Sequence, residues 1–333
     1  MTIRLSFALA VYTLTAFYAP ARAQEKTPDS LSLRRDYMTT QAALRYPFLR
    51  SAVIESELDG PIHYTAKLHG NNFLSGTIHP ENTVRGWAKL PLYTEGKQEI
   101  SATFGYLTQG ITLRNTVDKV PESPVGNGDY SLQTLSLSLN YKRRDSLFHK
   151  QLVWGGSLIA ASSLQSPVDR VSGLLYGVVI LSASRTTLIS AGMVVLLNAA
   201  STIPVLPTFS YWHKFTGTPW EISADLPTHV LLRTTVFSKG LLSFGTELSG
   251  DALFKKIDQP LLPSHIVIRD TDLKSGFTLE YPLFKKVLVG CRAGLLTPIQ
   301  TRLLERSAAI NDYYISVKRD TGPYLNFSIS LLP

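Results

Sequence analysis

The sequence has very little cysteine, and it has no continuous apolar run long enough to form a membrane-spanning helix. Its single cysteine, Cys291, excludes an internal disulfide framework. Cys291 lies in an apolar run at residues 287–291, which favours a small packed side chain over a reactive thiol. A spanning helix needs about 20 apolar residues, whereas the two most apolar stretches, residues 174–181 and 188–197, are separated by a polar segment.

Recognisable catalytic chemistry is also scarce. His63 and His69 share one face of a predicted strand, but six residues of strand separate them by about 20 Å, too far for one zinc ion. The chain has no Gly-x-Ser-x-Gly nucleophile elbow. We therefore predict no catalytic, cofactor-binding or metal-binding residues and a non-enzymatic protein. A lipid-modifying hydrolase or acyltransferase, assembled from distant strands, is the alternative.

The N-terminus has the pattern of a cleaved export signal. Arg4 precedes a short apolar run, and Ala21-Arg22-Ala23 matches the small-x-small cleavage pattern, which predicts a signal peptide at residues 1–23 and cleavage between Ala23 and Gln24. Residues 24–47 are polar and charged without a sustained period, and we interpret them as a mobile periplasmic lead-in.

The chain is basic. Its formal net charge is +8, and loss of Arg4 and Arg22 with the signal peptide leaves +6. Because an exported chain is removed from nucleic acid, the excess points instead to lipopolysaccharide phosphates or to a partly basic lumen that favours anionic solutes. Lysines and arginines gathered in solvated turns are the other explanation.

Residues 131–160 carry the clearest structural signal. Leu135, Leu137 and Leu139 alternate with small polar residues, then a basic segment at 142–145 predicts a turn, and a second run follows at 152–160. Alternation gives a strand one apolar and one polar face. Since similar segments recur behind an export signal, we interpret the apolar face as lipid-facing. Residues 48–333 are thus predicted to form an all-β, antiparallel up-and-down transmembrane β-barrel of about 12 strands, within a range of 10–14.

Several segments leave the prediction open. Residues 174–197 could form a helical hairpin, although their length and their valines favour two strands. Pro227 makes residues 229–236 either a bulged continuation or a separate strand. Residues 112–129 and 249–264 are predicted to be long loops, and residues 297–311 a loop with one helical turn.

Charged and histidine side chains inside predicted strands should avoid lipid, because a charge on the lipid face is costly. This reasoning predicts a polar lumen. The candidate lumen-lining residues are His63, Lys67, His69, Glu221, Asp225, Arg233, Glu280 and Arg292.

The last strand carries a family resemblance. Leu325, Phe327, Ile329 and Leu331 alternate with polar residues just before the C-terminus, and this pattern is similar to the C-terminal signal of bacterial outer-membrane proteins. With the aromatic segment at 204–227, the whole plan resembles porin-like outer-membrane β-barrel families of the Gram-negative type. The resemblance implies an outer-membrane location, recognition by the barrel-assembly machinery, contact with membrane lipid, and a role as a passive channel or a structural barrel. A surface or periplasmic β-sandwich that binds a partner is a further alternative.

Overall fold

The computed structural model describes residues 40, 42–118, 127–164, 168–198, 204–256, 264–306 and 308–333. The predicted signal peptide, with its cleavage site at Ala23 and Gln24, lies outside the described residues, as does most of the predicted lead-in. Residues 42–45 are helical and η1 (Pro47–Leu49) is a 3-10 helix. No helix of the described part is long and apolar enough to cross a membrane. The chain divides into two compact units, and the second of them, Arg50–Leu332, is built of antiparallel strands.

The strands follow one another along the chain with few interruptions. They are β1 (Ala52–Asp59), β2 (Ile62–Leu68), β3 (Asn71–Glu95), β4 (Gln98–Asp118), β5 (Gly128–Leu147), β6 (Lys150–Ser162), β7 (Arg170–Ala183), β8 (Thr187–Leu197), β9 (Val205–Lys214), β10 (Trp220–Leu226), β11 (His229–Val236), β12 (Gly240–Lys256), β13 (His265–Pro282), β14 (Val287–Glu305), β15 (Tyr313–Arg319) and β16 (Gly322–Leu331).

The sheet closes on itself through its first and last strands. β1 pairs with β16 on one edge and with β3 on the other, so no edge remains open at this seam. β1 and β2 are one strand interrupted at Gly60 and Pro61, because β2 continues the register of β1 against β3. β15 and β16 are likewise one strand, since Asp59 faces Tyr324 and Tyr64 faces Arg319 in a single continuous register.

The sixteen segments therefore make a ring of fourteen strands. The predicted antiparallel barrel is confirmed, but its strand number is 14 and not about 12. One closed sheet also excludes the β-sandwich alternative.

The seam is interrupted where each strand has a glycine next to a proline, so that Gly60 lies opposite Pro323 and Pro61 lies opposite Gly322. Proline has no N–H to donate, so the ladder loses bonds at Pro61 and Pro323. The Gly60 N–H donates to Pro323 O at 2.8 Å, and the Asp320 N–H donates to His63 O at 3.0 Å on the far side of the break. A Cβ atom on Gly60 would lie 2.8 Å from Pro323 Cγ, so glycine permits this close approach.

The open questions in the middle of the chain are settled in favour of strands. Residues 174–181 and 188–197 lie in the antiparallel pair β7 and β8 and not in a helical hairpin. β10 and β11 are separate strands that form a hairpin around Pro227.

The lengths predicted for three loops were wrong. β4 continues to Asp118, β12 to Lys256 and β14 to Glu305, so much of residues 112–129, 249–264 and 297–311 is strand. The basic segment at 142–145 also lies within β5, and the turn follows at Phe148 and His149, whose φ angles are 49° and 60°.

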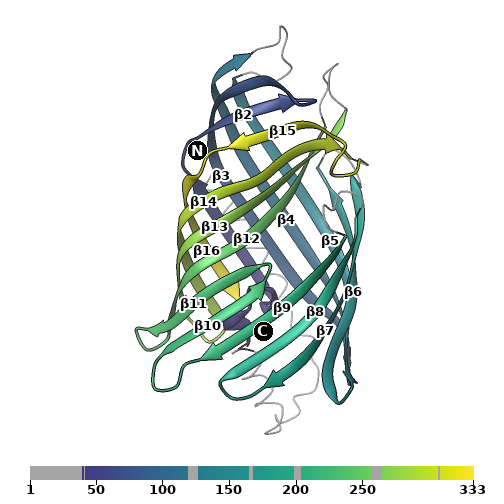
Figure 1. Cartoon of the computed structure of the whole chain (residues 1–333), viewed down its shortest axis with the longest axis vertical. Coiled ribbons are helices and arrows are strands. Elements are labelled where there is room, and N and C mark those ends of the chain that lie inside the picture. The colour runs from purple at the N-terminus through teal and green to yellow at the C-terminus, as the bar shows by residue number, and fades with distance from the viewer. Residues whose placement is uncertain are drawn as a thin grey trace. The chain divides into compact units, whose positions relative to one another are not determined.

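The barrel has two sections of different strand number. In Figure 1 the longer strands extend beyond the ends of β7 to β11. β6 ends beside Leu135 of β5, and β11 begins beside Glu247 of β12. Beyond these points β5 and β12 meet directly, pairing at Gln133 and Phe254, and the Thr134 hydroxyl donates to Ala252 O at 3.0 Å. The contact closes a ring of eight strands, namely β2, β3, β4, β5, β12, β13, β14 and β15. We call this ring the narrow section and the fourteen-stranded ring the wide section.

Strand β5 passes through both sections and reverses the polarity of its two faces between them. On the outer face, polar residues of the narrow section are followed by leucines of the wide section: Asp129, Ser131 and Gln133, then Leu135, Leu137 and Leu139. On the inner face the order is reversed: Tyr130 and Leu132, then Ser136, Ser138 and Asn140. The three leucines are 39, 47 and 52% exposed. They lie outside the closed ring, as the sequence predicted.

The reversal recurs in β13, which is separated from β5 in the narrow section by β12 alone. In β13, Ile266 and Ile268 face inward, whereas Phe277 and Leu279, in the wide section, are exposed. The wide section thus has an apolar exterior suited to lipid. The narrow section has the arrangement of a water-soluble barrel.

We expect the same substitution to have different costs at two positions on the outer face of β5. Leu137→Arg places a charge in the apolar band and should lower the free energy of unfolding by about 2–4 kcal/mol if it lies near the bilayer midplane. Ser131→Arg, six residues away in the narrow section, should change it by less than about 0.5 kcal/mol. Urea unfolding in phospholipid vesicles measures both, and equal costs would contradict the two-section arrangement.

Candidate functional site: a cavity in the narrow section

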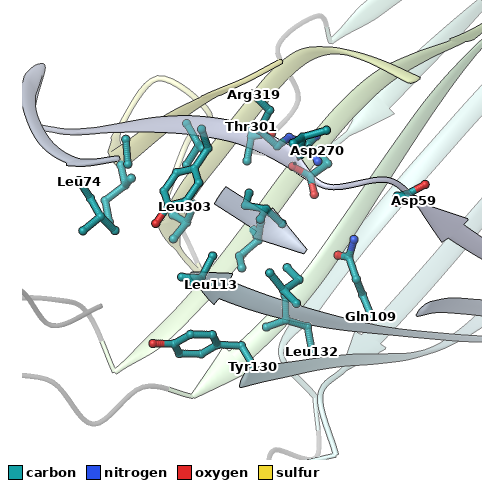
Figure 2. A pocket seen from close by; sticks show the side chains of 18 of the residues that line it. Asp59, Leu74, Gln109, Leu113, Tyr130, Leu132, Asp270, Thr301, Leu303 and Arg319 are labelled. Atoms are coloured by element: carbon teal, nitrogen blue, oxygen red, sulfur yellow. Dashed lines mark ion pairs between the residues drawn. The ribbon is translucent and has the colours of Figure 1, made fainter. Parts of the chain in front are cut away.

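The narrow section encloses a cavity of about 360 Å³. All eight strands contribute to its lining, and the side chains converge on one space (Figure 2). Most of them are apolar; Tyr64, Phe73, Leu113, Leu132, Ile266 and Ile315 come from β2, β3, β4, β5, β13 and β15. The volume falls in the range of small-molecule sites.

The cavity follows from the strand number. An eight-stranded barrel has an interior that side chains can nearly fill, or that can hold one small ligand. Tyr64, Ala66 and Phe73 form a buried cluster with Leu74, Leu113 and Ile315 at its wall. A small residue at Ala66 leaves part of the interior unfilled.

The exterior of the narrow section is sealed by a second apolar cluster. Phe254, Val267 and Leu304 are buried on the outer face and pack against Ile310, which lies in the connection between β14 and β15. This packing covers the outer wall where the strands of the wide section have ended.

Few polar groups reach the cavity. Arg319 lies 2.7 Å from Asp272 and 3.4 Å from Asp270, and Asp270 and Arg319 both line the cavity (Figure 2). Lys255 Nζ lies 5.1 Å from the centre of the Tyr130 ring, a cation–π contact. Burial lowers the pKa of the Lys255 ammonium in the narrow section.

A cluster of ion pairs lies at the polar end of the cavity. Lys274 Nζ donates to both carboxylate oxygens of Glu57 at 2.6 Å, and Asn326 Nδ2 donates to Glu57 at 3.3 Å. Arg85 lies 2.6 Å from Asp251. The contacts Lys274–Glu57 and Arg85–Asp251 join strands that are not neighbours in the sheet, whereas Asn326 and Glu57 face each other on the paired strands β16 and β1. We call Glu57, Asp251, Arg85, Lys274 and Arg319 with their direct partners the ion cluster.

Five candidate lumen residues lie in the wide section at strand positions that alternate with exposed apolar side chains. Glu221 and Arg233 are buried and lie 3.6 Å apart, and the Glu280 carboxylate lies 2.8 Å from Arg50. Arg292 lies 2.7 Å from Glu247, and Asp225 lies 3.0 Å from His229.

The positions predicted for His63, Lys67 and His69 were wrong. Ile62, Tyr64 and Ala66 line the cavity, so the alternate residues His63 and Lys67 point outward and are exposed. His69 lies in the turn after β2, with its ring against Tyr314. The prediction assumed lipid around the whole barrel. Where water surrounds the strand, its polar face turns outward.

The cavity itself was missed by the sequence analysis. A usable signal was present in β5, where the apolar residues change from even positions at Tyr130 and Leu132 to odd positions from Leu135. Such a change of parity within one strand marks the passage from one environment to another.

His229 has contacts that approach those expected of a hydrolase. His229 Nε2 lies 3.0 Å from Asp225 and 3.5 Å from the Ser223 hydroxyl. A catalytic triad needs the carboxylate on one ring nitrogen and the nucleophile on the other, whereas here both meet the same nitrogen. Within the described residues, no group of three or more potential ligands could hold a metal ion.

A closed antiparallel barrel with an apolar exterior is a transmembrane β-barrel of the outer-membrane type. No protein-family model matches the sequence, and no curated protein matches it. Among solved structures, the chain is similar to an outer membrane channel from Pseudomonas putida F1, with a TM-score of 0.36, 10% identity, and coverage of 85% of this chain and 95% of that one.

Two further structures have similar values. A Pseudomonas aeruginosa FadL homologue gives a TM-score of 0.41 at 7% identity over 84% of this chain and 89% of that one. The P. putida toluene transporter TodX gives 0.33 at 10% identity over the same shares. At these TM-scores, inferences about this chain depend on its own geometry.

The buried pair in the ion cluster gives a stability prediction. Lys274→Met leaves the Glu57 carboxylate buried without its cation and should cost about 3–5 kcal/mol, whereas adding Glu57→Leu should recover part of that loss. Arg114→Gln, which breaks an exposed pair with Asp129, should cost less than about 1 kcal/mol. Urea unfolding in vesicles measures all three. A double variant no more stable than Lys274→Met would argue against the pairing.

Proposed function

We propose that the protein is a non-enzymatic outer-membrane channel that takes up a small apolar molecule through the cavity of the narrow section. The observation that carries the proposal is the reversed polarity of that section. An apolar interior in a polar shell is not needed for contact with the bilayer, but it offers a desolvated site to an apolar ligand.

The proposed orientation puts the narrow section outside the cell. Outer-membrane barrels have short periplasmic turns and longer extracellular loops. At one end of this barrel the connections are short, as between β3 and β4 or between β5 and β6, and β1 begins and β16 ends there. The longer connections, such as that between β12 and β13, lie at the narrow end. Ligand capture would then precede passage into the membrane-embedded wide section.

The partners proposed for the exterior follow from this orientation. The apolar band of the wide section would contact membrane lipid, and basic residues on the outer face of the narrow section, such as Lys67 and Lys318, are placed to meet lipopolysaccharide phosphates. The C-terminal strand β16 presents Phe327 and Ile329 on its exposed face, the pattern expected for recognition by the barrel-assembly machinery.

Uptake in intact cells tests the proposal. Lipopolysaccharide retards apolar compounds, so a naphthylamine probe that fluoresces on entering the cell envelope should enter a Gram-negative host faster when this protein is expressed. Host cells that express the protein with a filled cavity serve as the control. Equal entry rates in cells with and without the protein would refute the proposal.

Filling part of the cavity should weaken ligand binding without unfolding the barrel. In Leu132→Trp the larger ring displaces about two methylene groups of ligand, each worth about 0.8 kcal/mol, which lowers affinity roughly tenfold. The matched control is Ser131→Trp, because Ser131 is exposed on the opposite face of the same strand. Fluorescence titration of the naphthylamine probe in nanodiscs, with empty nanodiscs subtracted, measures both. Equal affinities would place the ligand elsewhere.

A further inference from the structure

The pair Arg85–Asp251 joins two walls of the barrel that are not adjacent. In the narrow ring, β4 and β5 separate β3 from β12 on one side, and β2, β15, β14 and β13 separate them on the other. The guanidinium and the carboxylate nevertheless lie 2.6 Å apart. Two side chains from separated strands can meet only by reaching into the lumen, so the pair spans it.

The pair lies next to the cavity. Asp59 lines the cavity and lies within electrostatic reach of Arg85, Lys274 and Arg319. Arg319 and Asp270, which also line the cavity, belong to the same cluster. Arg85 and Asp251 do not themselves line the cavity, so they lie beyond its polar end, between it and the wide section.

Exposure distinguishes this pair from the rest of the cluster. The side chains of Lys274 and Glu57 are 4 and 6% exposed and are packed into the wall. Those of Arg85 and Asp251 are 22 and 27% exposed, and Glu55, 3.8 Å from Arg85, is 29% exposed. Partly exposed side chains that cross a lumen border its open part.

We propose that Arg85 and Asp251 form the constriction of the channel and set the size limit for solutes that pass between the cavity and the wide section. The inference rests on the proposed channel function, but it concerns a different place in the lumen. Arg85 supplies most of the reach, because its long side chain crosses toward the short side chain of Asp251 and is held there by Glu55 as well.

The test measures the swelling of proteoliposomes in uncharged sugars of increasing size. Arg85→Ala and Asp251→Ala should each raise the swelling rate for the larger sugars several-fold and shift the size limit upward. Arg85→Lys, which keeps a long cation, should stay close to the unchanged protein. Arg114→Ala is the matched control, because it breaks an arginine–aspartate pair on the outer face.

Folding is checked by the shift in gel migration between heated and unheated samples. If either alanine variant fails to fold, the exchanged pair Arg85→Asp with Asp251→Arg provides the second measurement, and it should restore a small size limit relative to Arg85→Asp alone. An unchanged size limit in folded alanine variants, or in folded Arg85→Asp, would overturn the proposal.

Binding of the naphthylamine probe separates this proposal from the proposed function. Arg85→Ala and Asp251→Ala should retain probe affinity, since neither residue lines the cavity. A protein that fails to bind the probe, but whose size limit still responds to Arg85 and Asp251, would refute the apolar ligand and leave the constriction standing. The opposite result would refute the constriction alone.

Discussion

A strand that leaves lipid and enters water must exchange the polarity of its two faces, and the architecture of this barrel depends on that constraint. In lipid the apolar side chains belong outside, and in water they belong inside. The strands β6 to β11 end where the change occurs, and the longer strands close into a ring of eight. The smaller strand number allows apolar side chains to face inward. In a ring of eight strands these side chains are close enough to pack, whereas in a ring of fourteen they would face water.

Local alternation was sufficient to predict the wide section and insufficient for the narrow one. Leu135, Leu137 and Leu139 indicated a lipid-facing strand, and the valines of β7 and β8 favoured strands over helices, because both signals depend on immediate neighbours. The face of β2 was assigned the wrong way round, since the pattern of Ile62, Tyr64 and Ala66 is the same whether lipid or a cavity meets it. The ends of β4, β12 and β14 were predicted to be loops because the segments that contain them have prolines and no sustained alternation.

For the charged residues, too, one property could be predicted from the sequence and another could not. That Glu280 and Arg292 avoid lipid could be predicted from the cost of a charge in the bilayer. Their partners could not, because Arg50 and Glu247 lie far away in sequence and meet them only after the ring has closed. The pair Glu57–Lys274, which joins β1 to β13, could not be predicted for the same reason. The strand number could not be predicted either, because it depends on recognising β1 and β2 as one interrupted strand.

The polarity of the wide lumen differs between its two walls, and this bears on how an apolar solute would leave the cavity. Charged groups gather on β1, β3, β12 and β13, where most of the ion cluster lies. β7 and β8 stand opposite β14 and β16 in the order of the ring, and their inward residues Leu174, Val178 and Val194 are apolar and partly exposed. Moving an apolar molecule through a cluster of buried charges disrupts paired groups that are costly to leave unpaired. Once a solute has passed Arg85 and Asp251, a path along the apolar wall avoids the charged groups of the opposite wall, so binding in the cavity and passage through the wide section are separate steps that depend on different residues.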